Sequence, residues 1–198
     1  SGATHGIVLD RSCFYPEGGG QEADYGRLSS NSASHQVLDT QKIGDLIVHL
    51  TSGPFEIGDL VEGRIDWNRR KQLMDHHTAV HIVGGAARRL LGPHIYQAGA
   101  NKSVETARLD ITHYRRLTRT DLDAIESMAN EVVQQVHRTE KMTLNRKDAD
   151  KKFGFDLYQG GAPKGSDIRI LRISDHDIQA CGGTHHDEPN RIGSIRII

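Results

Sequence analysis

The sequence has few cysteines, few aromatic residues, no long apolar run and almost no net charge. Two cysteines among 198 residues argue against a disulfide framework and favour a reducing compartment. The apolar runs are too short to cross a bilayer and no signal peptide is present, so we expect a cytoplasmic protein without a membrane partner. A formal charge of −1 gives no global basic field, so any nucleic acid must dock on a local patch.

The length allows one sizeable domain or two small ones. The chain begins Ser1-Gly2 without methionine, which predicts a domain excised from a longer protein. Several basic clusters could meet phosphates, although such runs are more often solvated helix faces. The clusters are Arg69-Arg70-Lys71, Arg88-Arg89, Arg115-Arg116 with Arg119, and Arg146-Lys147 with Lys151-Lys152.

Four candidate metal ligands fall into two pairs about a hundred residues apart. His77 and His81 are separated by four positions, so a helix would project both imidazoles from one face. Cys181 and His185 flank two glycines and a threonine, and the glycines allow a turn tight enough for both side chains to converge. A Cys/His₃ set suits tetrahedral Zn²⁺, so we predict one zinc ion per chain.

The ligand pairs do not fit three familiar zinc patterns. Thr78 stands where a zincin protease has its glutamate. Cys13 has no close cysteine neighbour, as a zinc finger would require, and the deaminase signature is absent. Four protein ligands would close the coordination sphere of a structural site, so a catalytic role requires one loose or displaced ligand.

The hydrophobic pattern predicts an α+β fold with two parts. Residues 1–66 carry short apolar runs at 6–9, 36–38, 46–50 and 61–65 between turn formers, which predicts a small β-barrel-like domain. Residues 67–198 predict a zinc-binding core of antiparallel sheet packed with helices. A first helix would begin after Asp66 or Asn68 and end near residue 91 at Gly92-Pro93.

The rest of the core is predicted from shorter signals. Thr118 and Asp121 predict the cap of a second helix whose apolar face runs from Leu122 to Val136. Residues 94–113 look extended, residues 142–144 form a strand and residues 147–152 a charged helix. A glycine-rich loop at Gly160-Gly161 precedes strands at residues 168–173 and 192–198.

Five blocks of sequence, in order, resemble the editing domain of alanyl-tRNA synthetase and the free-standing alanyl-tRNA editing proteins. The third and fourth of these blocks look most similar to the archaeal synthetases. The sequence departs from the family at Val80 and at residues 186–190. The blocks are Phe14-Tyr15-Pro16-Glu17-Gly18-Gly19-Gly20-Gln21, His77-Thr78-Ala79-Val80-His81, Gly92-Pro93-His94-Ile95-Tyr96-Gln97-Ala98-Gly99-Ala100, Ala107-Arg108-Leu109-Asp110 and Cys181-Gly182-Gly183-Thr184-His185.

The resemblance implies hydrolysis of the ester that joins serine or glycine to tRNA(Ala). A pocket built for alanine rejects an added hydroxyl only by a factor on the order of 10², so a second sieve is needed. The implied partners are the acceptor end of tRNA(Ala) and the ATP-using aminoacylation domains of a parent synthetase. Zinc would activate water or polarise the ester carbonyl.

The resemblance also implies roles for individual residues. Gln97 and Thr78 are the candidate catalytic residues, although a glutamine can instead satisfy loop backbone and a threonine can bond to its own helix. The glycine-rich motif and two residues of the fourth block are the candidate substrate-binding residues, and the glycines could equally form a tight turn between strands. These substrate-binding candidates are Gly18, Gly19, Gly20, Gln21, Arg108 and Asp110.

Two alternatives stay open at this point. The chain could be a free-standing editing protein that acts in trans. It could also be a zinc-stabilised RNA-binding module in which the metal only folds the domain and no reaction occurs.

Overall fold

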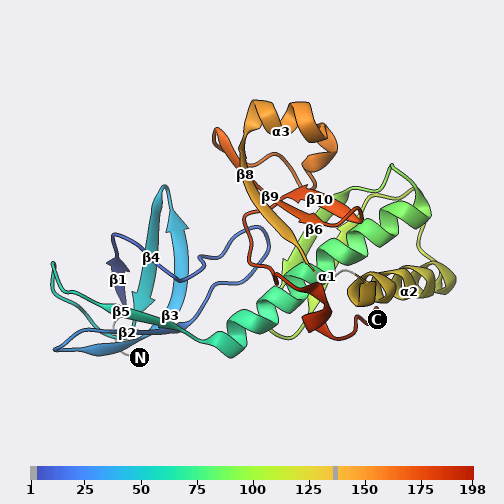
Figure 1. Ribbon diagram of the computed structural model, residues 1–198. Helices are drawn as coiled ribbons and strands as arrows, with labels where there is room; N and C mark the ends of the chain where they lie inside the picture. Colours follow the sequence, from blue (N-terminus) through green and yellow to red (C-terminus); the bar gives the residue numbers. More distant parts are fainter. Residues whose placement is uncertain (1–3, 136–137) are drawn as a thin grey trace.

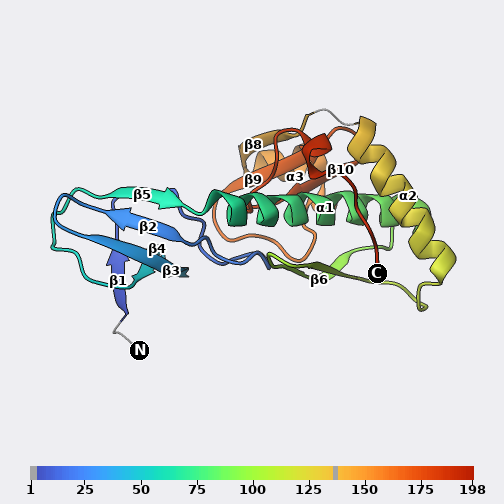
Figure 2. The same cartoon turned by 90° about the horizontal axis from the view of Figure 1, so that it is seen from below.

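The computed structural model describes residues 4–135 and 138–198 and has a mixed architecture organised along one long helix (Figure 1). An antiparallel sheet lies at the N-terminal end of α1, and the remaining helices and strands surround the rest of α1 (Figure 2). The predicted α+β class is therefore confirmed. Among the described residues, none of the helices has both the length and the apolar character needed to span a membrane.

The N-terminal sheet has five antiparallel strands in the order β1-β4-β3-β2-β5. Phe14, Leu28 and Val37 form its buried core. Strands β1 and β5 are its two edges, so the pairing of the described residues is open and does not close a barrel. The strands are β1 (His5–Val8), β2 (Gly26–Ser29), β3 (Ser34–Ile43), β4 (Leu46–Thr51) and β5 (Glu62–Ile65).

The helix α1 (Trp67–Leu91) begins and ends at the predicted residues. The carboxylate of Asp66 accepts a hydrogen bond from the backbone N–H of Arg69, which satisfies one of the free donors of the first turn. Gly92 ends the helix with φ of 118°, a conformation that side chains with a Cβ rarely adopt. Because this helix is continuous, His77 and His81 lie one turn apart.

The remaining elements pack around α1. The extended stretch forms a hairpin of β6 (Gln97–Lys102) and β7 (Ala107–Ile111). The helix α2 (Arg119–Gln135) has the predicted capping box, since Thr118 and Asp121 exchange hydrogen bonds between their side chains and backbone N–H groups. Val136, which we expected on the same helix face, lies outside the described residues.

A three-stranded antiparallel sheet in the order β10-β9-β8 completes the core. It packs against α3 on one side, while α1 and α2 share a larger apolar cluster with β9 that includes Ile82, Ile125 and Leu171. The elements are β8 (Glu140–Asn145), α3 (Arg146–Phe153), the 3₁₀ helix η1 (Phe155–Leu157), β9 (Asp167–Ile173), β10 (Asp177–Ala180) and the 3₁₀ helix η2 (Pro189–Ile192).

The strand expected at residues 192–198 is wrong. This segment follows η2 without joining a sheet. Ile195 and Ile197 pack against the α1–α2 cluster. Their backbone N–H groups donate to side chains of α2, at 2.8 Å to Asn130 Oδ1 and 2.5 Å to Glu126 Oε2. The alternating isoleucines thus pack on the helices, and their backbone N–H groups donate to side chains of α2 instead of to a neighbouring strand.

Candidate metal centre

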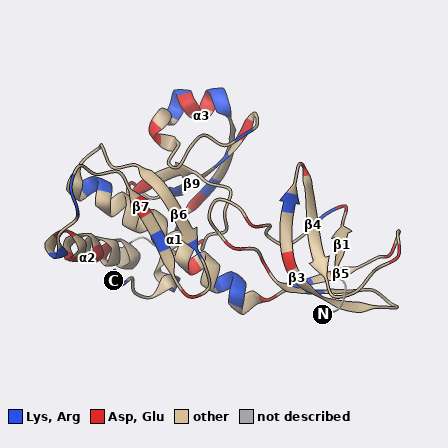
Figure 3. Ribbon diagram, turned by 180° about the vertical axis from the view of Figure 1, so that it is seen from behind, with Lys and Arg blue, Asp and Glu red and all other residues tan. Residues whose placement is uncertain are grey.

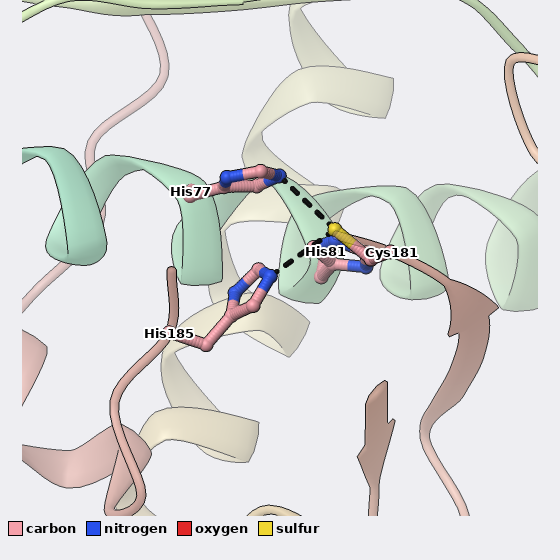
Figure 4. Close-up of side chains that lie close together, drawn as sticks. All are labelled: His77, His81, Cys181 and His185. Atoms are coloured by element: carbon pink, nitrogen blue, oxygen red, sulfur yellow. Dashed lines mark hydrogen bonds between the residues drawn. The ribbon is translucent and has the colours of Figure 1, made fainter. Parts of the chain in front are cut away.

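The four predicted ligands converge on one point. His77 and His81 come from α1, whereas Cys181 and His185 come from the turn that follows β10 (Figure 4). One donor atom from each lies within 4.8 Å of all the others. The Cys181 Sγ is 3.4 Å from His77 Nε2 and 3.2 Å from His185 Nε2.

The chemistry of these donors, and the spacing of the Cys181 sulfur from two of the imidazoles, suit a tetrahedral metal ion. Ligand bonds of about 2.0 to 2.3 Å place tetrahedral ligand atoms about 3.3 to 3.8 Å apart. The three histidines are almost completely buried, and Cys181 has intermediate burial. A buried set of one thiol and three imidazoles, with few other polar contacts at its centre, can hold a metal ion.

Each histidine of the cluster uses its second ring nitrogen to contact another side chain. Such contacts fix the tautomer and the ring orientation of metal-ligating histidines. They leave Nε2 as the nitrogen that faces the cluster. The pairs of atoms are His77 Nδ1 with Gln21 Oε1 at 2.7 Å, His81 Nδ1 with Asp177 Oδ2 at 3.1 Å, and His185 Nδ1 with Thr78 Oγ1 at 3.4 Å.

The ionisation of the metal-free cluster favours a thiolate. Burial would raise the pKa of Cys181, but the neighbouring imidazoles, His81 first among them, outweigh it and hold that pKa well below its usual range. Burial opposes charge on His81 as well, yet the Cys181 thiolate and Asp177 raise its pKa to about 9. Burial lowers the pKa of His77 to about 4 and that of His185 well below its usual value.

Only one of the two glycines in the Cys181-to-His185 turn is required by close packing. A Cβ on Gly183 would lie 2.1 Å from His77 Cε1, whereas a Cβ on Gly182 would meet nothing within 4 Å. The side chain of Arg169 on β9 donates to the carbonyl oxygen of Gly182 at 2.9 Å and to that of Gly183. The turn therefore approaches α1 at Gly183 and is held from behind by β9.

The glycine-rich motif reaches this centre from the N-terminal sheet. Gly20 has φ of 74°, and a Cβ there would lie 2.1 Å from the carbonyl oxygen of Ala100 on β6. Gly20 O accepts from the backbone N–H of Lys102 at 2.6 Å, and Gly19 O accepts from the Lys102 ammonium at 2.8 Å. This close backbone contact places Gln21 next to His77.

The two candidate catalytic residues, Thr78 and Gln97, differ in their contacts with the four ligands. Thr78 is buried and contacts His185, so its hydroxyl is not used within its own helix. Gln97 starts β6, where its backbone N–H donates to Gln159 Oε1 at 3.1 Å. Among the described residues, Gln97 forms no hydrogen bond with any of the four ligands.

Arg108 and Asp110 lie on β7, on the exposed hairpin. Their side chains form an ion pair of 3.2 Å, and both are more than two-fifths exposed. An exposed pair of this kind contributes little to stability. Their proposed contact with substrate remains a prediction.

Three residues near the centre were not anticipated from the sequence. Asp177 orients His81, Arg169 holds the turn, and Lys102 anchors the glycine-rich motif from a position only 1% exposed. Burial lowers the pKa of Lys102. Asp177 lies four positions before Cys181, and this proximity is the only sequence signal that could have suggested it.

The fold and the cluster together define a mixed α/β domain with a Cys/His₃ centre of the metal-binding type. Comparison with known proteins gives the family. The sequence model described as tRNA synthetases class II (A) matches residues 1–69. Alanine–tRNA ligases of Ignicoccus hospitalis, Metallosphaera sedula and Pyrococcus furiosus are 46%, 48% and 48% identical to the chain over 97% of its length.

The chain thus matches one segment of alanyl-tRNA synthetases, and the resemblance to this family seen in the sequence is confirmed. It spans 21 to 22% of the length of these relatives.

Proposed function

We propose that this chain hydrolyses mischarged tRNA(Ala), removing serine and also glycine, as the editing segment of a longer alanine–tRNA ligase. The supporting observation is the convergence of four ligand side chains on one point in a chain homologous to alanine–tRNA ligases. The reaction is cleavage by water of the ester between the amino acid and the tRNA, with the tRNA hydroxyl as the leaving group.

His77, His81, Cys181 and His185 would hold Zn²⁺. Zinc bound there would supply a Lewis acid for the ester carbonyl, or lower the pKa of a water towards about 7. The chain contributes orientation, since the second nitrogen of each histidine is held by a neighbouring side chain. Cys181 is less buried than the three histidines, so we propose that the aminoacyl group approaches from its side.

Selectivity requires a pocket that prefers serine to alanine. A polar group that bonds to the serine hydroxyl would be left unpaired by alanine, at a cost of about 1 to 3 kcal/mol. Thr78 and Gln97 are the polar side chains that we propose for this task. Thr78 lies at the cluster, and Gln97 lies on the strand that also carries Lys102.

The partner that we propose is the acceptor end of tRNA(Ala), whose phosphates require exposed basic side chains. Lys and Arg gather at both ends of α1 and on α3 (Figure 3). Arg69 and Arg70 are mostly buried in ion pairs with Glu22 and Asp24, so these two arginines hold the glycine-rich loop against α1. The exposed lysines of α3 suit phosphate contact better.

A second function is favoured by the number of ligands. Four protein donors are enough to close a tetrahedral zinc site, and a closed site is structural. The chain would then be a zinc-stabilised RNA-binding module without hydrolytic activity. The partial exposure of Cys181 favours the catalytic alternative.

The deciding experiment compares hydrolysis of Ser-tRNA(Ala) and Ala-tRNA(Ala) by the purified chain. Its arms are the metal-loaded protein, the chelator-treated protein, Cys181→Ala and Gln97→His. Editing predicts rapid loss of serine, slow loss of alanine, and loss of activity in the chelated and Cys181→Ala proteins. Equal rates in all arms would contradict it. Retained tRNA binding without hydrolysis in any arm would support the RNA-binding module.

A further inference from the structure

Gln21 is the one residue of the glycine-rich motif that contacts the candidate metal centre. It belongs to the loop between β1 and β2, yet its side chain is completely buried between α1 and the turn after β10. Its partners, His77 and Thr184, lie 56 and 163 positions away in the sequence. A buried amide with partners this distant indicates a specific role for the loop at the centre.

The hydrogen bonds of Gln21 determine which ring nitrogen of His77 carries the proton. His77 Nε2 faces the sulfur of Cys181, so Nδ1 carries the proton and donates to Gln21 Oε1 at 2.7 Å. The same oxygen accepts from the backbone N–H of Thr184 at 3.1 Å. The amide nitrogen donates to Thr184 Oγ1 at 2.9 Å. One amide therefore links a ligand on α1 with the turn that carries the other two.

The position of Gln21 is fixed by β6. Gly18 and Gln21 pair with each other, and Gln21 also pairs with Lys102 in parallel register. The close contact of Gly20 with the Ala100 carbonyl leaves no room for a side chain at Gly20. The loop therefore cannot move away from β6 without losing both contacts.

We propose that Gln21 is a positioning residue of the metal centre, which fixes the ring and tautomer of His77 and joins it to the Thr184 turn. Through this residue the N-terminal sheet takes part in metal binding. The inference rests on the proposed metal site but does not require the hydrolytic activity. Outer contacts of this kind change metal affinity by about 10- to 100-fold.

The test measures Zn²⁺ affinity by competition with a chelator, and the visible absorption of the Co²⁺-loaded protein. Gln21→Met keeps the size of the side chain and removes both hydrogen-bonding groups, so we expect affinity to fall about 10- to 100-fold and the Co²⁺ bands to shift. Gln21→Glu restores the acceptor for His77 and Thr184, so we expect affinity within a few-fold of the parent. This rescue distinguishes orientation of His77 from simple loss of packing.

Gln159→Met is the matched control. Gln159 is also a buried glutamine, and its side chain accepts from Gln97 and donates to Asp156, away from the ligands. We expect this variant to bind both metals as the parent does. A general effect of removing a buried amide would lower affinity in both methionine variants.

A second pair of variants displaces the loop without changing Gln21. Gly20→Ala forces a Cβ against the Ala100 carbonyl, while Gly19→Ala meets nothing within 4 Å although both residues have positive φ. We expect Gly20→Ala to reproduce the affinity loss of Gln21→Met and Gly19→Ala to leave affinity nearly unchanged. These variants test the proposal even if Gln21→Met does not fold.

The outcomes separate this inference from the proposed function. Failure of the parent chain to bind Zn²⁺ or Co²⁺ would overturn both. Tight binding by the parent with unchanged affinity in Gln21→Met and Gly20→Ala would overturn the role of Gln21 alone. Weak binding by Gln21→Glu as well would also contradict it, because the restored acceptor should have rescued the site.

Discussion

The imidazole of His186 is bonded to Asp75, with 2.5 Å between Nε2 and Oδ1. Both residues are buried, and they join the segment after the last ligand to α1, two positions before His77. His186 lies in the segment, residues 186–190, where the sequence departs from the family. The residue at this departure therefore has a specific partner in the fold. Its hydrogen bond joins the same two segments that carry the four candidate ligands.

Removing either member of this pair should destabilise the fold. Asp75→Ala and His186→Ala should each lower the free energy of unfolding by about 1 to 3 kcal/mol, because a buried polar group is left without its partner. The double variant should lose less than the sum, with a coupling energy of about 0.5 to 3 kcal/mol. Urea unfolding in excess chelator measures this without a contribution from metal.

Lys71→Ala is the control for that cycle. Lys71 contacts the other oxygen of Asp75 at 2.8 Å, but its side chain is 47% exposed. An exposed ion pair contributes about 0 to 1 kcal/mol, so we expect a small effect. Additive losses in the Asp75 and His186 variants would show that their hydrogen bond does not stabilise the junction.

The two cysteines should differ completely in metal binding. Cys181→Ser replaces the only thiol of the cluster by a poor zinc ligand, so affinity should fall by more than the roughly 100-fold that outer contacts produce. Cys13→Ser should have no effect, since Cys13 is exposed and lies in the N-terminal sheet region. Metal content after dialysis against a chelator is the measurement. Equal metal retention by both variants would show that Cys181 is not a metal ligand.

The sequence identified the four candidate ligands because each pair is encoded locally. The spacing of His77 and His81 needs only a helix, and that helix has strong start and stop signals at Asp66 and Gly92. The contacts of Asp177 and Lys102 depend on how distant segments pack, so no local pattern identifies them. The same limit applies to Gln21, which we expected at the substrate but which contacts His77.

Strand prediction failed where one pattern fits two environments. The segment Gly26–Ser29 has a single large apolar residue, Leu28, and gave no strand signal, yet it pairs with β3 on one side and β5 on the other. The isoleucines near the C-terminus gave a strong strand signal, yet they pack on α2. In both cases tertiary contacts outweigh the local preference.

The domain boundary between residues 66 and 67, which we predicted from the change of hydrophobic pattern, remains a proposal.

His49 should make the N-terminal sheet sensitive to acid. It is completely buried, its Nδ1 lies 3.0 Å from Ile7 O and its Nε2 lies 2.6 Å from Ser12 Oγ. Burial lowers its pKa below the usual value, although the Ile7 carbonyl partly opposes this. The unfolded chain therefore binds more protons as the pH falls below about 6.5, and stability is lost in that direction.

The comparison that isolates this effect is His49→Gln against the parent, by urea unfolding at about pH 7.5 and about pH 5. Glutamine can retain hydrogen bonds but cannot titrate. We expect the variant to be less stable than the parent at neutral pH and to lose less stability on acidification. Equal losses in both proteins would assign the acid sensitivity to other titratable groups.

The last prediction concerns Gln97 and the loop after η1. A Cβ on Gly160 would lie 2.7 Å from Gln97 Nε2, whereas a Cβ on Gly161 would meet nothing within 4 Å. Both glycines have positive φ, so alanine strains the backbone at either position. Only Gly160→Ala also pushes the Gln97 amide. If Gln97 contacts the aminoacyl group, this displacement should slow hydrolysis of Ser-tRNA(Ala) by on the order of 10-fold or more.

Single-turnover hydrolysis of Ser-tRNA(Ala) by Gly160→Ala and Gly161→Ala measures this displacement. Zn²⁺ affinity should be unchanged in both, because neither glycine contacts the four ligands. A similar slowing in both variants would assign the effect to strain in the loop. Normal rates in Gly160→Ala, together with normal rates in Gln97→His, would exclude Gln97 from substrate contact, because a displaced amide and a replaced one should both disturb the bound serine.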